Sequence, residues 1–213
     1  SMKTKKDSSK LFNFIAPVYG WFYKSQKKRY KRIIEEVAHE IDLKHYETII
    51  DLGCGTGALA STLDDMGLKV TAVDQASKMI KIAKKKNKDK SIQFIQGDLL
   101  EALPFKPHQF DLAIASYVAH GLSKEERRKM YFAMSRLAKD YVIIHDYNAN
   151  RAPLTSFVEY LEGGDYFYFI DNAEKEMEAC IQDMKTCFSE VKVIDVDVRA
   201  SWYLCKVDPN LKE

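Results

Sequence analysis

The chain lacks the features that would indicate a secreted, membrane-spanning or metal-cluster protein. Its four cysteines are scattered, with no Cys-x-x-Cys pair, so we expect reduced thiols and neither a disulfide framework nor a zinc cluster. No apolar run approaches the roughly 20 residues that cross a bilayer, and the amino end has no secretory hydrophobic segment. The formal net charge of +2 is too small to indicate a nucleic-acid partner. These absences favour a cytoplasmic protein with no membrane span.

Size and composition favour one enzyme-sized domain. A chain of 213 residues, of which 46% are apolar, can bury one core but has little room for two. We predict a flexible basic tail over residues 1–10 and a single domain over residues 11–213. Within that domain, residues 11–41 are expected to form a helical cap and residues 151–186 an aromatic insertion.

The most informative segment joins a strand pattern to a glycine loop. The β-branched, apolar run Thr48 to Leu52 predicts a buried parallel strand, and the apolar spacing from Ala58 to Leu68 predicts a packed helix. Between them stand Gly53, Gly55 and Gly57. Glycines permit a tight turn at positive φ and remove Cβ atoms, so backbone amides and a helix N-terminus can approach a ligand. We therefore predict a backbone-lined ligand site here.

The acid that precedes the loop decides between two ligands. Gly53, Gly55 and Ala58 also fit the fingerprint of dinucleotide-binding dehydrogenases. Asp51 argues against that function, because a buried carboxylate beside a pyrophosphate would be a like-charge clash. The run from Asp51 through Cys54 to Gly57 resembles the first motif of class I S-adenosylmethionine-dependent methyltransferases. The resemblance implies S-adenosylmethionine as cofactor, S-adenosylhomocysteine as product, and an acid that faces the methionine end.

Later segments resemble the same family in the same order. The run Lys69 to Asp74 predicts a second strand that ends in an acid, and an acid there can hydrogen-bond both ribose hydroxyls of an adenosine. Gln75 follows it and is predicted to line the cofactor. The run Ser91 to Leu99 resembles the family's third strand, in which Asp98 would accept from the adenine amino group and Leu99 would pack on the ring.

The fourth strand resembles the family over Phe110 to Ser116. By this resemblance, Ser116 and Tyr117 flank the methionine moiety. An ordinary role remains open for Asp98 and Asp111, since carboxylates after strands commonly cap loops.

The resemblance covers roughly residues 12–147, and the nearest branch contains the ubiquinone and menaquinone biosynthesis methyltransferases. It implies an α/β fold: a doubly wound, Rossmann-like, seven-stranded mixed sheet, mostly parallel, with an antiparallel C-terminal hairpin and helices on both faces. The hairpin is predicted over residues 191–198 and 201–207, and the fifth strand over residues 141–144. Helices are predicted over residues 25–41, 75–86 and 123–138, and Ser123 with Glu126 forms a capping box.

Two aromatic segments are candidates for the acceptor pocket. One lies in the insertion after the fifth strand, and the other runs over residues 11–23 and resembles the family segment that folds over the cofactor. Here Gly20 follows Tyr19 where the family usually has an acid, so Tyr19 receives only a role at the cofactor edge. Ordinary helix packing is the alternative for both segments. Aromatic walls would suit a planar or apolar acceptor.

Two histidines are candidates for the catalytic base. Methyl transfer from a sulfonium is an in-line displacement that needs no metal, and the magnesium pattern of catechol-type enzymes is not matched. His120 and His145 both follow strands on the ligand side of the sheet. Either imidazole could accept a proton from an acceptor hydroxyl, amine or carbon acid. The alternative for each is a hydrogen-bonded loop histidine, and His145 is slightly favoured for substrate contact.

The sequence thus predicts an S-adenosylmethionine-dependent methyltransferase that acts on a small molecule, with two rival functions. One rival is a catalytically silent methyltransferase-like protein that binds a partner. The other is an RNA methyltransferase recruited through the basic tail and the run Lys84 to Lys90. For that run, a solvated helix end is the simpler interpretation, since cationic side chains suit a helix C-terminus.

Overall fold

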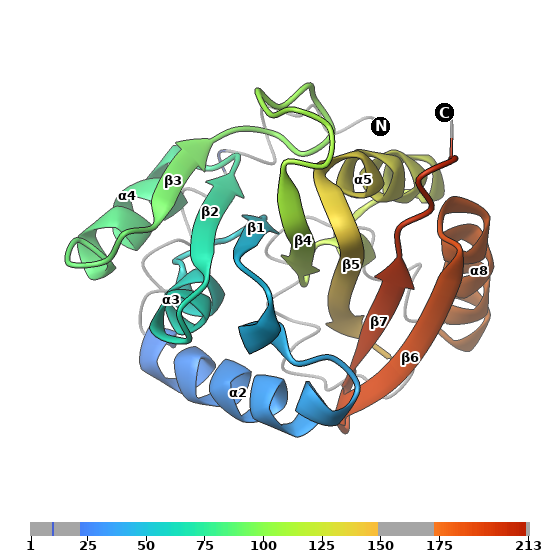
Figure 1. Ribbon diagram of the computed structural model, residues 1–213, viewed down its shortest axis with the longest axis horizontal. Helices are drawn as coiled ribbons and strands as arrows, with labels where there is room; N and C mark the ends of the chain where they lie inside the picture. Colours follow the sequence, from blue (N-terminus) through green and yellow to red (C-terminus); the bar gives the residue numbers. More distant parts are fainter. Residues whose placement is uncertain (1–9, 11–21, 149–172, 212–213) are drawn as a thin grey trace.

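A computed structural model describes residues 10, 22–148 and 173–211 of the chain, and its side chains from residue 178 onward in the last range. A seven-stranded sheet runs in the order β3-β2-β1-β4-β5-β7-β6 (Figure 1). Its strands are β1 Thr48–Leu52, β2 Lys69–Asp74, β3 Gln93–Gln96, β4 Phe110–Ser116, β5 Ala138–Tyr147, β6 Glu190–Asp197 and β7 Ala200–Lys206. Strands β1 to β5 pair in parallel, whereas β7 is antiparallel to both β5 and β6. The predicted doubly wound mixed sheet with a C-terminal hairpin is confirmed.

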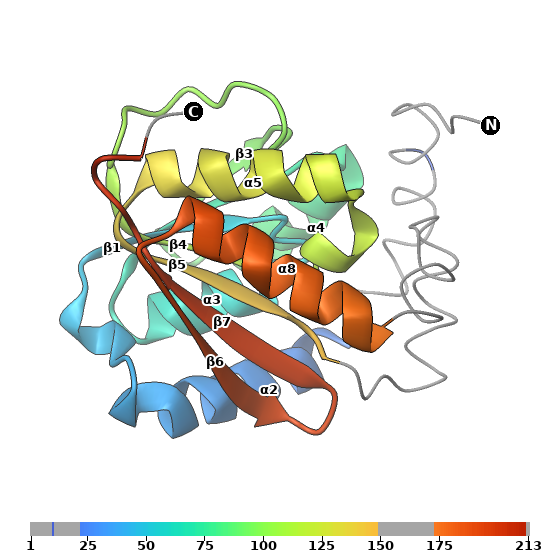
Figure 2. The ribbon, with the colours of Figure 1, turned by 90° about the vertical axis from the view of Figure 1, so that its right-hand side faces the viewer.

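Helices cover both faces of this sheet, as predicted. The α-helices are α2 Tyr23–Glu36, α3 Ala58–Asp65, α4 Ser77–Lys86, α5 Lys124–Leu137 and α8 Ala173–Cys187. Figure 2 shows α5 and α8 on one face, and α2 and α3 on the other. The 3₁₀ turns are η1 Val37–His39, η2 Leu43–His45 and η3 Ala119–Gly121. Ser123 and Glu126 form the predicted capping box of α5.

The core consists of two clusters, because side chains along each strand alternate between the two faces of the sheet. In β1, Ile49 packs with α2 and α3, whereas Ile50 packs with α5 and α8. The same switch occurs in β5, where Ile143 belongs to the first cluster and Ile144 to the second. Because successive side chains of a strand point to opposite faces, neighbours in sequence enter different surroundings. We call the two sides the α2 face and the α5 face.

Some boundaries differ from the sequence prediction. Helix α3 ends at Asp65, short of the predicted Leu68, because the chain turns through Gly67 at φ 95°. Helix α4 begins at Ser77, which leaves Asp74 and Gln75 outside it. Helix α8 takes the last part of the segment that was predicted to be an aromatic insertion.

Several predictions fall outside the described residues. They concern residues 1–9 of the predicted tail, residues 11–21 of the aromatic segment, Tyr19 among them, and residues 151–172 of the predicted insertion. Within the described ranges, none of the helices is long and apolar enough to cross a membrane.

Candidate functional site

The glycine loop lies at the carboxyl end of β1 and is held against β2. The amides of Gly53 and Cys54 both donate to the carbonyl of Val73, at 2.7 and 2.9 Å. Gly53 has φ 77°, and a Cβ on it would lie 2.5 Å from Cγ2 of Val118. Gly55 has φ 54°, and a Cβ there would meet no atom of the described residues within 4 Å. The loop is therefore packed on the Gly53 side and open on the Gly55 side, where a ligand can approach the backbone.

Asp51 is a buried carboxylate that lacks a partner in the described part of the chain. The residue is 1% exposed, and neither of its carboxyl oxygens accepts a hydrogen bond there. Burial, together with the charge of Asp74, raises the pKa of Asp51 to about 8. A buried polar group normally has a partner, and a cation would favour the ionised form of this one. The side chain thus suits a positively charged ligand group.

Asp74 fixes the loop to the next strand. One carboxyl oxygen accepts from the Gly55 amide and the other from the Ala76 amide, both at 2.9 Å. Burial raises the pKa of Asp74, and these two hydrogen bonds oppose the rise. Each carboxylate oxygen has a second lone pair, so both can still accept from a ribose hydroxyl. The predicted ribose role and the observed loop role are compatible.

The remaining cofactor candidates lie along the same edge of the sheet. Asp98 accepts from the Leu100 amide at 2.9 Å, which is the loop-capping contact left open as its alternative. Leu99 is 9% exposed, and Gln75 is exposed at the end of β2. Cys54 is buried, and burial raises the pKa of its thiol, so it is not a reactive thiolate.

On the α2 face, His145 is enclosed by aromatic side chains. Its Nδ1 lies 3.2 Å from Nε1 of Trp202, and its Nε2 lies 3.3 Å from the Tyr117 hydroxyl. An indole N–H can only donate, so Nδ1 accepts and the imidazole proton is on Nε2. Burial lowers the pKa of His145 to about 4. With both nitrogens engaged and the ring neutral, this geometry does not favour the predicted role of His145 as a base.

On the same face, α2 contributes Tyr30 to the site. The Tyr30 hydroxyl lies 2.7 Å from Oγ of Ser116, and its ring meets the edge of His145 with centroids 5.6 Å apart. Tyr117 follows Ser116 at φ 57°, a conformation that is uncommon for residues other than glycine. Burial raises the pKa of Tyr117 to about 12. Sequence reasoning missed Tyr30, because nothing in the pattern of α2 separates it from ordinary core residues.

On the α5 face, His120 and Asp146 form a buried pair. Nδ1 of His120 donates to Oδ1 of Asp146 at 2.9 Å, and the two side chains are each 5% exposed. The backbone amides of His120 and Tyr147 also donate to this carboxylate, at 3.2 and 2.8 Å. The ring of Tyr147 packs edge-on against His120, with centroids 5.0 Å apart. The sequence identified His120 but not its partner.

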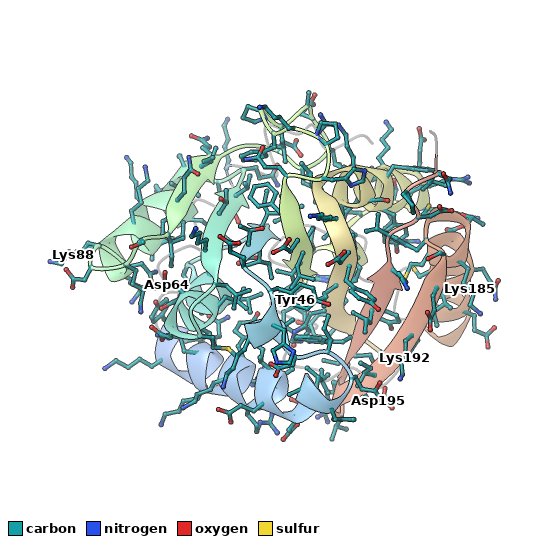
Figure 3. The ribbon with its side chains drawn as sticks, in the orientation of Figure 1. Tyr46, Asp64, Lys88, Lys185, Lys192 and Asp195 are labelled. Atoms are coloured by element: carbon teal, nitrogen blue, oxygen red, sulfur yellow. The ribbon has the colours of Figure 1, made fainter. Side chains whose placement is uncertain are left out.

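The basic run at the end of α4 lies away from this site. Figure 3 shows Lys88 projecting from the outer end of α4. Lys90 forms ion pairs with Asp65 and, at 3.8 Å, with Asp64. The last turn of α4 carries Lys84, Lys85 and Lys86, where cations are favoured by the helix dipole.

Comparisons with known proteins show what the chain is similar to. Residues 49–140 match a family model described as a methyltransferase domain. The chain is 30% identical over 168 residues to a demethylmenaquinone methyltransferase of Paenarthrobacter aurescens, covering 75% of this chain and 63% of that protein. By these matches, the chain resembles the class I S-adenosylmethionine-dependent methyltransferases. This methyltransferase is also 28% identical to an uncharacterized methyltransferase of Bacillus velezensis, over 84% of this chain and 86% of the relative.

A solved structure shares the fold of this methyltransferase over its full length. A putative S-adenosyl-L-methionine-dependent methyltransferase from Methanococcus maripaludis matches with a TM-score of 0.69 and 21% identity, covering 100% of this chain and 99% of the other. The cofactor of the family fits the residues present. Among the described residues, the loop is open at Gly55, and the nearby Asp51 has no hydrogen-bond partner and suits the ammonium group of S-adenosylmethionine.

Proposed function

We propose that this methyltransferase transfers the methyl group of S-adenosylmethionine to a small-molecule acceptor by direct in-line displacement. The observation that carries the proposal is Asp51 at the end of β1, which is buried and has no hydrogen-bond partner among the described residues, because a cationic cofactor would offset the cost of burying its charge. Similarity to the Paenarthrobacter relative, a demethylmenaquinone methyltransferase, supports a small-molecule acceptor. Since the chain spans 63% of the length of that relative, we propose only the class of the acceptor, a small molecule.

The protein's contribution to the reaction is chiefly positioning. When bound, S-adenosylmethionine supplies an electrophilic methyl carbon and a neutral thioether as leaving group. Holding the nucleophile in line at about 3 Å can contribute roughly 7 to 11 kcal/mol of the barrier. The loop around Gly53 is fixed by β2 and Val118, so it provides the rigid wall that such alignment requires.

His120 is the catalytic base in this proposal, and Asp146 is its positioning residue. Because Nδ1 donates to Asp146, the basic lone pair of His120 lies on Nε2. Nε2 would take up the proton that the acceptor loses when it is methylated. Asp146 then stabilises the imidazolium. His120 lies in η3, shortly after β4, and Asp146 lies near the end of β5, so the pair is at the carboxyl ends of these strands, where open α/β sheets bind their ligands.

Calorimetric titration tests the cofactor assignment. Wild-type protein is titrated with S-adenosylmethionine, with S-adenosylhomocysteine and with NADH. We expect micromolar binding of the two adenosyl ligands and none of NADH. Failure of both adenosyl ligands to bind would favour a catalytically silent relative, and binding of NADH alone would favour a dehydrogenase.

A labelled-methyl assay tests the acceptor class. The radiolabelled methyl group of S-adenosylmethionine is offered together with a protein-free, small-molecule cell extract, and separately with total RNA. We expect label to enter the small-molecule fraction. Transfer to RNA alone would contradict the proposed acceptor class.

RNA methylation remains a second candidate because one relative favours it. The chain is 38% identical over 88 residues to ribosomal RNA small subunit methyltransferase A of Mesomycoplasma hyopneumoniae, covering 41% of this chain and 34% of that protein. Binding to RNA that weakens steeply with salt would support this function, since neutralised phosphates release counterions. Binding that is absent or insensitive to salt would contradict it.

A further inference from the structure

A small cavity lies on the α5 face, against the His120–Asp146 pair. Side chains of α5, α8, β5 and β7 surround it, and the pair itself forms part of its wall. Figure 2 shows α5 and α8 side by side over this face of the sheet. The cavity offers about 10 Å³ to the centre of a water molecule, which is room for one water and far too little for a methyl acceptor. It is thus a place for a solvent molecule beside the site.

Two helices contribute side chains four residues apart to the wall of this cavity. Arg127 and Tyr131 come from α5, and Cys180 and Met184 come from α8. Because residues four apart lie on the same side of a helix, each helix presents one stripe to the cavity. Arg127 is 5% exposed and donates from Nη1 to the Leu122 carbonyl at 2.8 Å. The α5 stripe thus brings polar groups to a cavity that α8 lines with sulfur-containing side chains.

The hydroxyl of Tyr131 is a buried polar group without a hydrogen-bond partner. The residue is 0% exposed, and its oxygen has no donor or acceptor among the described residues. Its ring packs edge-on against Phe188 with centroids 6.3 Å apart, which holds the ring in place. A buried hydroxyl normally has a partner, whereas phenylalanine would fill the same space without burying a polar atom. The hydroxyl therefore indicates a polar ligand in the cavity that Tyr131 lines.

We propose that one water molecule binds in this cavity and links the Tyr131 hydroxyl to the His120–Asp146 pair, which makes Tyr131 a positioning residue for His120. The inference rests on the proposed role of His120 as the base. Asp146 accepts from Nδ1 of His120 at 2.9 Å, and a water held by Tyr131 restrains that pair from the side of α5. A buried water typically makes about three hydrogen bonds, and a fully satisfied network gives a side chain one fixed orientation.

Crystal structures of the wild type and of Tyr131→Phe, at a resolution that shows ordered water, test the site. In the wild type we expect one water within hydrogen-bonding distance of the Tyr131 hydroxyl. In Tyr131→Phe that position should hold no water, because the remaining wall has lost the hydroxyl. A dry cavity in the wild type would overturn the inference, and so would a water that stays in the same place in Tyr131→Phe.

Nitrogen NMR of protein with isotopically labelled histidine tests the positioning role, because imidazole shifts distinguish a proton on Nδ1 from one on Nε2. The chain has five histidines, and His120→Gln identifies the signal of His120. The wild type should show the Nδ1–H form of His120, and Tyr131→Phe should add a measurable share of the Nε2–H form. In the labelled-methyl assay, kcat of Tyr131→Phe should fall about five- to tenfold with KM unchanged. A wild-type His120 signal or a wild-type kcat in this variant would overturn the inference.

Tyr23→Phe is the matched control, because it removes a buried tyrosine hydroxyl on the α2 face. That hydroxyl donates to Oδ1 of Asn87 at 3.0 Å. The variant should unfold at a lower temperature and keep the wild-type kcat and His120 signal. An equal loss of kcat in Tyr23→Phe and Tyr131→Phe would overturn the inference, since general destabilisation would explain both. A wild type that transfers no methyl group would instead overturn the proposed function, while the density and the His120 signal would still decide the water site.

Discussion

Two neighbouring residues of β5, His145 and Asp146, point to opposite faces of the sheet and have different surroundings. His145 points to the α2 face, where Trp202 and Tyr117 occupy both ring nitrogens and burial keeps the ring neutral. Asp146 points to the α5 face, where it accepts from Nδ1 of His120. His145 is thus enclosed in an aromatic cluster, whereas His120 is held by a carboxylate, as the proposed base would need. A histidine's partners, rather than its position after a strand, decide its chemistry.

Replacing each histidine tests this contrast and should give the largest effect. His120→Gln should lower kcat about 10²- to 10⁴-fold, because the general base is lost, with little change in cofactor affinity. His145→Gln should instead lower the unfolding free energy by about 1–3 kcal/mol, since Trp202 loses its acceptor. The measurements are labelled-methyl transfer and chemical denaturation. A larger loss of kcat in His145→Gln than in His120→Gln would reverse the two assignments.

Asp51→Asn tests whether the α2 face recognises the cofactor by charge. Removing one partner of a buried charge pair costs about 2–5 kcal/mol, so affinity for S-adenosylhomocysteine should fall by at least tenfold. The cofactor-free variant should be more stable than wild type at pH 8. The pKa of Asp51 is raised in the folded state, so ionisation above the unfolded-state pKa destabilises the wild type, and asparagine does not ionise. Calorimetry and denaturation at two pH values measure both effects.

The pH dependence of cofactor binding is a second test of the proposed role of Asp51. Because burial and Asp74 raise the pKa of Asp51 to about 8, the free protein holds a proton there at lower pH, and that proton must leave before an ammonium can pair. Affinity for S-adenosylhomocysteine should rise about tenfold per pH unit as pH approaches 8. Methylthioadenosine, which has no amino acid moiety, should show no such rise. Equal slopes for the two ligands would assign the titration to another group.

Trp202→Phe should produce the smallest effect. It tests the hydrogen bond that Trp202 donates to His145. Loss of the indole N–H removes one hydrogen bond to Nδ1, which should cost about 1 kcal/mol of unfolding free energy. Turnover should stay within a few-fold of wild type, since His120 and Asp146 lie on the other face. Tyr203→Phe, the next residue of β7 on the α5 face, provides a comparison at the same depth. A turnover loss confined to Trp202→Phe would tie His145 to the reaction.

Much of the fold could be predicted from local patterns. Strands β1, β2 and β4 begin and end at the predicted residues, because each is an apolar, β-branched run bounded by polar or glycine residues. Strand β5 is longer than predicted, Ala138–Tyr147 instead of residues 141–144. The strand begins at Ala138, which pairs with Phe110. The sequence pattern did not indicate this start, because Lys139 and Asp140 are exposed polar residues. Long-range pairing can extend a strand through residues of low propensity.

The residues of the candidate site also differ in whether the sequence could predict them. The glycine loop, Asp51 and Asp74 could be found in the sequence, because a positive-φ turn and a buried acid impose residue types at fixed spacing. The contact of Tyr30 with Ser116 could not, since a helix that contributes a side chain to a site has the same apolar stripe as one that only packs.

The sequence by itself determined the order of strands and helices, the glycine loop and the buried acid beside it. Local backbone conformation and hydrophobic periodicity are properties of neighbouring residues, so they can be seen in one dimension. Only the tertiary structure decided which histidine meets a carboxylate. That outcome depends on the pairing of His145 with Trp202 across β5 and β7, and on η3 bringing His120 to Asp146 from 26 residues away. Contacts between distant segments are set by packing and register, which no local pattern encodes.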